Sequence, residues 1–263
     1  METNDASSLA SRVISDGLVV LENVFSQEYC DKYKQILDDV LSNRIDSNSY
    51  CGNNENQVLD NYFLDNHSLL NLIYQDITDK VMRLLIDDDY VLISPSARNR
   101  RILDIKQFGK PTSGHGWHTD SRFIQSGKGL NPSLCYMTII CIEDFGADNG
   151  ATHYVPKSHS LYKRPEDRDA DLEFEIISAK KGSLVIFDTA LWHRVGPVSS
   201  KSRWGVFNTY GPWFMKPYHR FYDMFNQEES SKFPQIIRQL LHFNSITPLD
   251  HNERMATLRR IGL

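Results

Sequence analysis

From Tyr90 onward the chain is a succession of short apolar or alternating runs separated by turn signals, and this pattern limits the possible fold most. The runs cover residues 90–94, 101–108, 133–142, 172–177, 183–187 and 203–210. Between them lie Gly-Lys-Pro at 109–111, Asp-Asn-Gly at 148–150, Lys-Gly at 181–182 and Gly-Pro at 196–197. Short strands with polar turns and few long helices are typical of an antiparallel sandwich or barrel.

Helical patterns flank this β region on both sides. Apolar residues at helical spacing predict helices over 28–41 and 69–86, after a short strand at 17–21, and helices return near 233–243 and 252–261. The polar, Asn-rich stretch 42–56 predicts a loop. With 263 residues and no linker-like tract, we expect one domain over 1–263. Its parts are a helical N-terminal part (about 1–89), a β core (about 90–215) and C-terminal helices (about 216–263).

His118 and Asp120, in the sequence Gly-Trp-His-Thr-Asp at 116–120, are the first candidate metal ligands. On a strand or extended edge the two-residue period places both side chains on one face, where an imidazole and a carboxylate can bind one metal ion. A second histidine would complete a two-His-one-carboxylate set with open positions, which suits non-haem Fe(II) and oxygen chemistry. An isolated His-x-Asp is a weak signal, because three-residue patterns recur by chance.

His193 is the best candidate for the third ligand, because it follows the predicted strand 183–187 and precedes a turn; His153 and His159 are its rivals. Of these two rivals, His159 is better explained as a residue that orders a loop by hydrogen bonding than as a metal ligand. Arg203 opens the apolar strand 203–210, and a buried arginine is costly unless it meets an anion. A dicarboxylate that chelates the metal and pairs with the Arg203 guanidinium would offset this cost. The alternative is an ion pair with an acid such as Glu143.

Taken together, several separated segments resemble the phytanoyl-CoA dioxygenase family of Fe(II)/2-oxoglutarate-dependent oxygenases. They are DGLVVLENVF at 16–25, WHTD at 117–120, EDFGADNGATHYVPKSH at 143–159, GSLVIF at 182–187 leading to His193, and Arg203. The similarity covers most of residues 16–215. The ordered set of motifs is far more specific than any one of them.

The resemblance implies a mainly β fold with flanking helices, a double-stranded β-helix (a cupin-like jelly roll) with the metal at one mouth. By position, His118, Asp120 and His193 would bind Fe(II) and form the catalytic centre. Arg203 would bind the distal carboxylate of the co-substrate 2-oxoglutarate. O2 is the second co-substrate that the resemblance implies.

Family members often add polar contacts to 2-oxoglutarate from the strands before and after the His-x-Asp motif. Here Gln107 or Lys106 fits the first position, and Gln107 is favoured because Leu103 and Ile105 share its face. Tyr136 or Thr138 fits the second position. Strand parity puts Tyr136 and Thr138 on the same face, so both are expected to point inward.

The implied activity is hydroxylation of an unactivated C–H bond of a small-molecule metabolite, with release of succinate and CO2. Desaturation and ring formation stay open, whereas the carboxylate of Asp120 argues against halogenation, since related halogenases carry a small residue there. Two other classes fit less well: a non-catalytic jelly-roll module that binds a ligand or senses a metal, and a zinc hydrolase or isomerase. The substrate is not specified. A basic cluster at Arg98, Arg100 and Arg101 suits an anionic substrate, but a solvated surface is the more economical interpretation.

Composition and charge narrow the partners. The net charge of −5 argues against nucleic acid, which favours a basic face. No apolar run approaches the length of a membrane span. The first residues lack the layout of a secretory signal, and Cys135 and Cys141 look like buried thiols, so a cytoplasmic location is expected. The oligomeric state is open.

Overall fold

The structure is a computed structural model that describes residues 5–46, 51–52, 56–101, 116–120, 133–166, 172–244, 249–253 and 255. Its helices are α1 (Ala6–Asp16), α2 (Gln27–Asp46), α3 (Asp76–Leu85), α5 (Gln227–Ser231) and α6 (Gln235–Leu240), with 3-10 turns η1 (His67–Leu72), η2 (Ser158–Leu161) and η4 (Phe221–Asp223). Its strands are β1 (Leu18–Leu21), β2 (Cys51–Gly52), β3 (Asn56–Asp60), β4 (Val91–Arg100), β5 (Tyr136–Cys141), β6 (Thr152–Tyr154), β7 (Glu175–Ile176), β8 (Leu184–Asp188), β9 (His193–Val195) and β10 (Arg203–Gly211).

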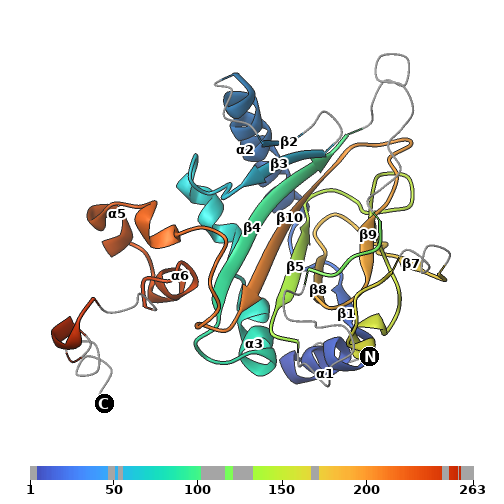
Figure 1. Cartoon of the computed structure of the whole chain (residues 1–263). Coiled ribbons are helices and arrows are strands. Elements are labelled where there is room, and N and C mark those ends of the chain that lie inside the picture. The colour runs from blue at the N-terminus through green and yellow to red at the C-terminus, as the bar shows by residue number, and fades with distance from the viewer. Residues whose placement is uncertain are drawn as a thin grey trace.

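The strands form two antiparallel sheets. The major sheet has the order β1-β8-β5-β10-β4-β3-β2, and the minor sheet has the order β7-β6-β9. Figure 1 shows the minor sheet on the side of the major sheet that is opposite to α5 and α6. In the major sheet β10 lies between β4 and β5, with Arg203 opposite Arg100 and Phe207 opposite both Ser96 and Ile139. This register decides which side chains share a face.

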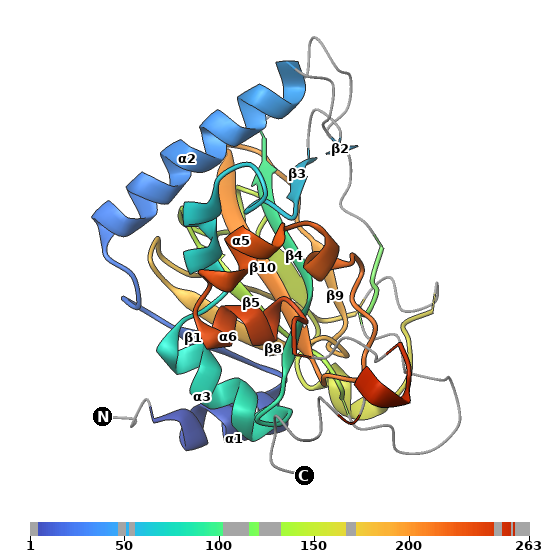
Figure 2. The same cartoon turned by 90° about the vertical axis from the view of Figure 1, so that its left-hand side faces the viewer.

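The two faces of the major sheet pack against different layers. One face packs against the helices, and Figure 2 shows α2, α3, α5 and α6 in front of it. Its strand residues belong to the largest apolar cluster, together with residues of α1, α2, α3 and α6; they include Tyr136, Ile140, Ile186, Val206 and Tyr210. The alternate residues face the minor sheet and form a second cluster, which includes Met137, Ile139, Phe187 and Phe207. The sheet therefore supplies both the core and one wall of the space between the sheets.

The N-terminal third contains the short strand expected at 17–21, as β1, but it departs from the helical part expected over 1–89 because it also contributes β2 and β3 to the major sheet. The helix expected over 69–86 is divided into η1 and α3. Side chains of β10 explain the break: Asn208 donates to the carbonyl oxygen of Leu72 at 2.8 Å, and Tyr210 donates to that of Ile73 at 2.9 Å. These carbonyls are satisfied by the sheet rather than by a continuing helix.

The runs expected at 133–142, 172–177, 183–187 and 203–210 each contain a strand, whereas the run expected at 90–94 continues as β4 to Arg100, and β6 and β9 were not expected. The expected strand 101–108 lies almost wholly outside the described residues. Cys135 and Cys141 are buried free thiols, as expected, and burial raises the pKa of Cys141 to about 12. Across the described part of the chain, no helix is both long enough and apolar enough to cross a bilayer.

Candidate metal centre

The segment that carries His118 and Asp120 lies along the edge of the minor sheet. His118 and His193 exchange two backbone hydrogen bonds of 3.0 Å, and the amide of Asp120 donates to the carbonyl oxygen of Thr189 at 2.9 Å. The chain is thus extended next to β9, and the two-residue period turns both side chains to the same side. The pairing brings together residues far apart in the sequence.

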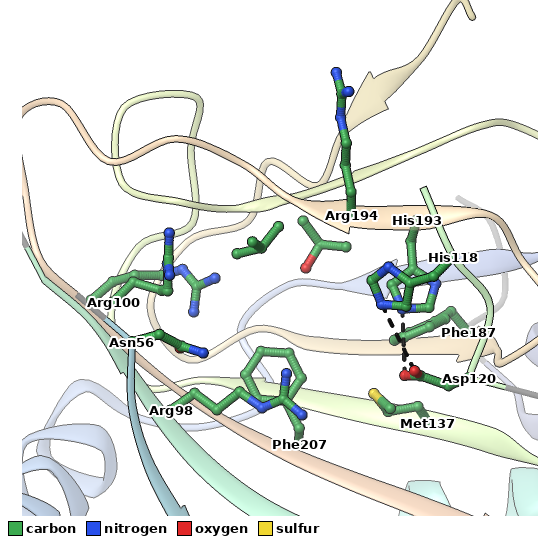
Figure 3. A pocket seen from close by; sticks show the side chains of 13 residues that line it. Asn56, Arg98, Arg100, His118, Asp120, Met137, Phe187, His193, Arg194 and Phe207 are labelled. Atoms are coloured by element: carbon green, nitrogen blue, oxygen red, sulfur yellow. Dashed lines mark ion pairs between the residues drawn. The ribbon is translucent and has the colours of Figure 1, made fainter. Parts of the chain in front are cut away.

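Three side chains converge at this point. The Nε2 atom of His118 lies 3.8 Å from Oδ1 of Asp120, and Nε2 of His193 lies 3.4 Å from Oδ2 of the same carboxylate. The ligand atoms of all three residues lie within 4.8 Å of one another. In Figure 3 both imidazoles stand above Asp120 and point towards it. This donor set, two nitrogens and one carboxylate, is the one expected from the sequence.

Backbone carbonyls orient both imidazoles. Nδ1 of His193 lies 2.7 Å from the carbonyl oxygen of Leu191, and Nδ1 of His118 lies 3.0 Å from that of Gly116. A carbonyl oxygen only accepts, so each Nδ1 carries the proton and donates. In the neutral imidazole Nε2 is then a lone-pair donor facing an anion. Such an arrangement requires a cation or a shared proton between the groups, and it is how proteins fix metal-binding histidines.

The electrostatics of the cluster agree with this geometry. Burial favours the neutral form of Asp120, but when His193 also carries a proton on Nε2, its hydrogen bond and positive charge, with a further contribution from His118, hold the pKa of Asp120 well below the usual range. Burial favours the neutral form of His193, yet the hydrogen bond and charge of Asp120 raise its pKa above the ordinary value. The carboxylate therefore stays ionised and attracts positive charge to its neighbours.

Arg203 lies at the other end of the same cavity, where it is 1% exposed. Its Nη2 donates to the carbonyl oxygen of Gly150 at 2.6 Å, whereas the buried Nε and Nη1 have no hydrogen-bond partner among the described residues. Burial lowers its pKa to about 9, so the guanidinium is charged at neutral pH. The alternative pairing with Glu143 is not formed: that carboxylate accepts from the amide of Trp204 at 2.8 Å. In the part of the chain that the structure describes, no carboxylate forms an ion pair with Arg203 to offset the cost of its burial.

The Asp-Asn-Gly turn at 148–150 positions the Gly150 carbonyl that accepts the hydrogen bond of Arg203. Oδ1 of Asn149 accepts from the amide of Gly146 at 2.9 Å, and its Nδ2 donates to the carbonyl oxygen of Asp144 at 2.7 Å. This closes the loop and presents the Gly150 carbonyl to Arg203. The Asp-Asn-Gly motif, one of the segments that carry the family resemblance, therefore positions the carbonyl that binds the Arg203 guanidinium.

The rival histidines lie elsewhere. Nε2 of His159 donates to the carbonyl oxygen of Ile14 at 3.0 Å, so it ties a loop to the end of α1, as expected from the sequence. His153 stacks on Phe174 with ring centroids 4.7 Å apart. Neither belongs to the three-residue cluster that the described residues form.

The structure corrects the expected orientation of Tyr136 and Thr138. Both lie on the same face of β5, as strand parity requires, but Tyr136 packs in the core against the helices and Thr138 is fully buried. The residue of β5 that reaches the cavity is Met137. The parity of a strand shows which residues share a face, not which face is inward. Gln107 and Lys106 lie outside the described residues.

Sequence reasoning missed part of the cavity wall. Arg98 and Arg100 of β4 both line the cavity; Arg100 is buried there, whereas Arg98, like Arg101, is exposed to solvent. Asn56 of β3 and Phe207 of β10 join them, as Figure 3 shows. The available signal was the alternation Ser94, Ser96, Arg98, Arg100, a polar set on one face of a strand beside a buried arginine.

Comparison with known protein families shows to which family the chain belongs. The sequence model of the phytanoyl-CoA dioxygenase (PhyH) family matches residues 14–205, which is more than half of the chain and includes His118, Asp120, His193 and Arg203. The chain belongs to the phytanoyl-CoA dioxygenase family. Uncharacterized proteins of Mycobacterium bovis and Mycobacterium tuberculosis are each 28% identical to it over 103 residues. This match spans 39% of the chain and only 36% of each relative.

Solved structures share the fold at low sequence identity. HygX from Streptomyces hygroscopicus, with nickel and 2-oxoglutarate bound, gives a TM-score of 0.63 at 12% identity over 80% of this chain and 89% of its own. EctD from S. alaskensis with bound Fe gives 0.62 at 16% identity over 82% and 81%. The epimerase SnoN, in complex with Fe3+, alpha ketoglutarate and nogalamycin RO, gives 0.61 at 13% identity over 81% and 86%. The predicted jelly roll with flanking helices is confirmed for this member of the family.

Proposed function

We propose that the chain is an Fe(II)/2-oxoglutarate-dependent oxygenase that hydroxylates an unactivated C–H bond of a small molecule and releases succinate and CO2. The observation that carries this proposal is His193, whose protonated Nδ1 is fixed on the Leu191 carbonyl while Nε2 faces the ionised Asp120 at 3.4 Å. A buried imidazole held in this way is suited to a divalent cation.

The donor set fits the proposed metal. His118, Asp120 and His193 would hold Fe(II) through two nitrogens and one carboxylate, a combination that leaves positions for further ligands. The structures of HygX with nickel and of EctD with Fe support this choice by analogy of fold.

Arg203 fits the proposed co-substrate. Its two unpartnered buried nitrogens provide donors for a carboxylate, and a bidentate guanidinium–carboxylate pair would offset the cost of burying the charge. The opposite end of 2-oxoglutarate would then lie towards the three metal ligands, since both groups line one cavity.

When bound, Fe(II) with 2-oxoglutarate and O2 supplies the oxidation of the C–H bond. The residues of this chain bind, orient and shield the reactants. The ring of Phe187 contacts His193 edge-on at 5.5 Å between centroids, and Met137 and Phe207 add apolar wall to the same cavity. This apolar lining packs beside His193, which is buried, whereas the side chains of His118 and Asp120 are 43% and 35% exposed.

Anaerobic titration of the purified protein with Fe(II) and 2-oxoglutarate tests the proposal, followed by admission of O2 with a panel of small molecules. We expect one Fe(II) per chain, a visible absorption band that requires both additions, and succinate formation. Asp120→Ala should remove all three. Ligand binding that needs no metal would instead identify a binding module, and equal turnover with Zn(II) would identify a zinc enzyme.

A further inference from the structure

A second cavity lies beside Asp120, on the far side of the metal ligands from Arg203. It shares Asp120, Met137, Phe207 and Arg98 with the cavity described above, but His118, His193 and Arg203 do not line it. Its other polar side chains are Ser94, Ser96, Thr209 and Tyr218. If 2-oxoglutarate extends from the metal to Arg203, this second cavity is the space next to the metal that remains for a substrate.

Arg98 lies on the wall between the two cavities and is held in a defined position. Its Nε donates to Oγ of Ser96 at 3.1 Å, and its guanidinium stacks over the Phe207 ring, 5.0 Å from the centroid. These contacts use the edge and the face of the guanidinium but leave its charge without an ion-pair partner among the described residues. A guanidinium fixed in this way is preorganised for an anion.

Charge balance gives the second argument. Fe(II), Asp120, the two carboxylates of 2-oxoglutarate and Arg203 together carry no net charge. Arg98 is additional to this set, and it lies on the same inner face of β4 as Arg100, whose strand position is opposite Arg203. An anion that enters the cavity beside Asp120 would therefore be attracted by the positive charge of Arg98.

The local register makes room for this charge. Arg98 lies opposite Gly205 on β10, which has no side chain, and opposite Val58 on β3. Phe207, the next inward residue of β10, separates it from Arg203, whose guanidinium carbon is 6.0 Å from the same ring. Arg98 and Arg203 therefore lie in different parts of the space between the sheets.

We propose that Arg98 anchors the substrate, and that the substrate is a small polar molecule bearing a carboxylate or a phosphate. Its anionic group pairs with Arg98, and hydroxyl or amine groups meet Ser94, Ser96 and Thr209 on the same wall. Its reacting carbon is then held beside Asp120. This inference rests on the proposed function, because it assigns the first cavity to 2-oxoglutarate.

Isothermal titration calorimetry on the full chain, loaded with Ni(II) and saturating 2-oxoglutarate, tests the assignment. The probes are gluconate against glucitol for a carboxylate, and glycerol 3-phosphate against glycerol for a phosphate. We expect the charged member of at least one pair to bind at least tenfold more tightly than its neutral partner, and the pair that responds identifies the anion. Equal affinity within both pairs, including no binding by any probe, would overturn the proposal.

Variants separate the two cavities. Arg98→Gln should lower the affinity for the charged probe about tenfold or more, as expected for loss of a charge-assisted contact, and should weaken 2-oxoglutarate binding less than Arg203→Gln does. Arg98→Lys should recover part of the preference for the charged probe, which guards against a folding defect. Arg101→Gln, the same charge change at a residue that lines neither cavity, should alter neither affinity.

Two results would point elsewhere. If Arg98→Gln weakens 2-oxoglutarate as much as Arg203→Gln does, Arg98 belongs to the co-substrate site and the proposal is wrong. If the unmodified protein fails to bind 2-oxoglutarate at all, the proposed function itself fails, and this is seen before any probe is added.

Discussion

The guanidinium of Arg203 lies on the face of Phe145, with its central carbon 3.8 Å from the ring centroid. This contact depends on Gly205, two residues further along β10. A Cβ atom there would lie 2.7 Å from Cζ of Phe145 and 3.1 Å from Cε2 of Phe207. Both neighbours are ring atoms in a packed interior, so neither can give way without moving the ring. The glycine is what allows the aromatic support of Arg203.

Gly205→Ala should therefore displace Phe145 and weaken 2-oxoglutarate binding. We expect the KM for 2-oxoglutarate to rise several-fold, since a buried cation–π contact contributes about 2 kcal/mol. Overpacking should lower the free energy of unfolding by roughly 1–3 kcal/mol. Steady-state kinetics and urea unfolding measure the two effects. The control is Gly146→Ala, where the nearest atom to an added Cβ is Oδ1 of Asp148 at 3.4 Å. Equal kinetics for both variants would contradict the assigned role of Phe145.

Arg203→Lys should separate charge from geometry. Lysine keeps the positive charge but loses the planar fork that pairs with a carboxylate. We expect the affinity for 2-oxoglutarate to fall roughly 10- to 100-fold while Fe(II) affinity is unchanged. Titration of the metal-loaded protein with 2-oxoglutarate measures the first quantity, and equilibrium dialysis measures the second. Loss of both together would show that Arg203 stabilises the fold rather than a ligand.

His193 and His159 form a matched pair, since both are buried histidines that contact a backbone carbonyl. His193→Ala should reduce Fe(II) affinity more than about 100-fold, because even changes beyond the ligands alter metal affinity 10- to 100-fold. His159→Ala should cost about 1–3 kcal/mol of stability through the orphaned Ile14 carbonyl, without affecting the metal. Dialysis against Fe(II) and denaturant unfolding distinguish them. Metal loss in the His159 variant would reopen the choice of third ligand.

The sequence predicts the β core and the four residues of the centre because their signals are local or ordered. His118 and Asp120 are two residues apart, so their common face follows from strand geometry alone. The choice of His193 needed its position after a strand, and the structure explains it through the backbone pairing with His118. Both inferences follow from the spacing of residues along the sequence.

Other features depend on which face of a strand is covered, and spacing does not carry that information. Tyr136 and Thr138 share a face as predicted, but that face packs against the helices, because the N-terminal third supplies a helical layer to it. The same ambiguity made Arg100, which is 4% exposed, look like a surface residue. When both faces of a strand are covered, polar residues can point into the interior as well as apolar ones. Which cavity a polar side chain lines is then decided by how the two sheets pack.

His242 should make stability depend on pH. It is 4% exposed, its Nε2 donates to the carbonyl oxygen of Leu92 at 2.8 Å, and burial lowers its pKa below the ordinary 6.5. The unfolded chain therefore binds a proton more readily than the folded chain as pH falls below about 6.5. Stability from this residue is complete above that pH and decreases as pH falls towards the lower folded pKa.

His242→Gln keeps a donor that can reach the Leu92 carbonyl but does not titrate. We expect the free energy of unfolding of the unmodified chain to fall more between pH 7.5 and pH 5 than that of this variant. Urea unfolding at the two pH values gives the difference, and carboxylate titrations common to both chains cancel in it. Parallel pH profiles would show that His242 is already protonated in the folded state or that its burial is relieved.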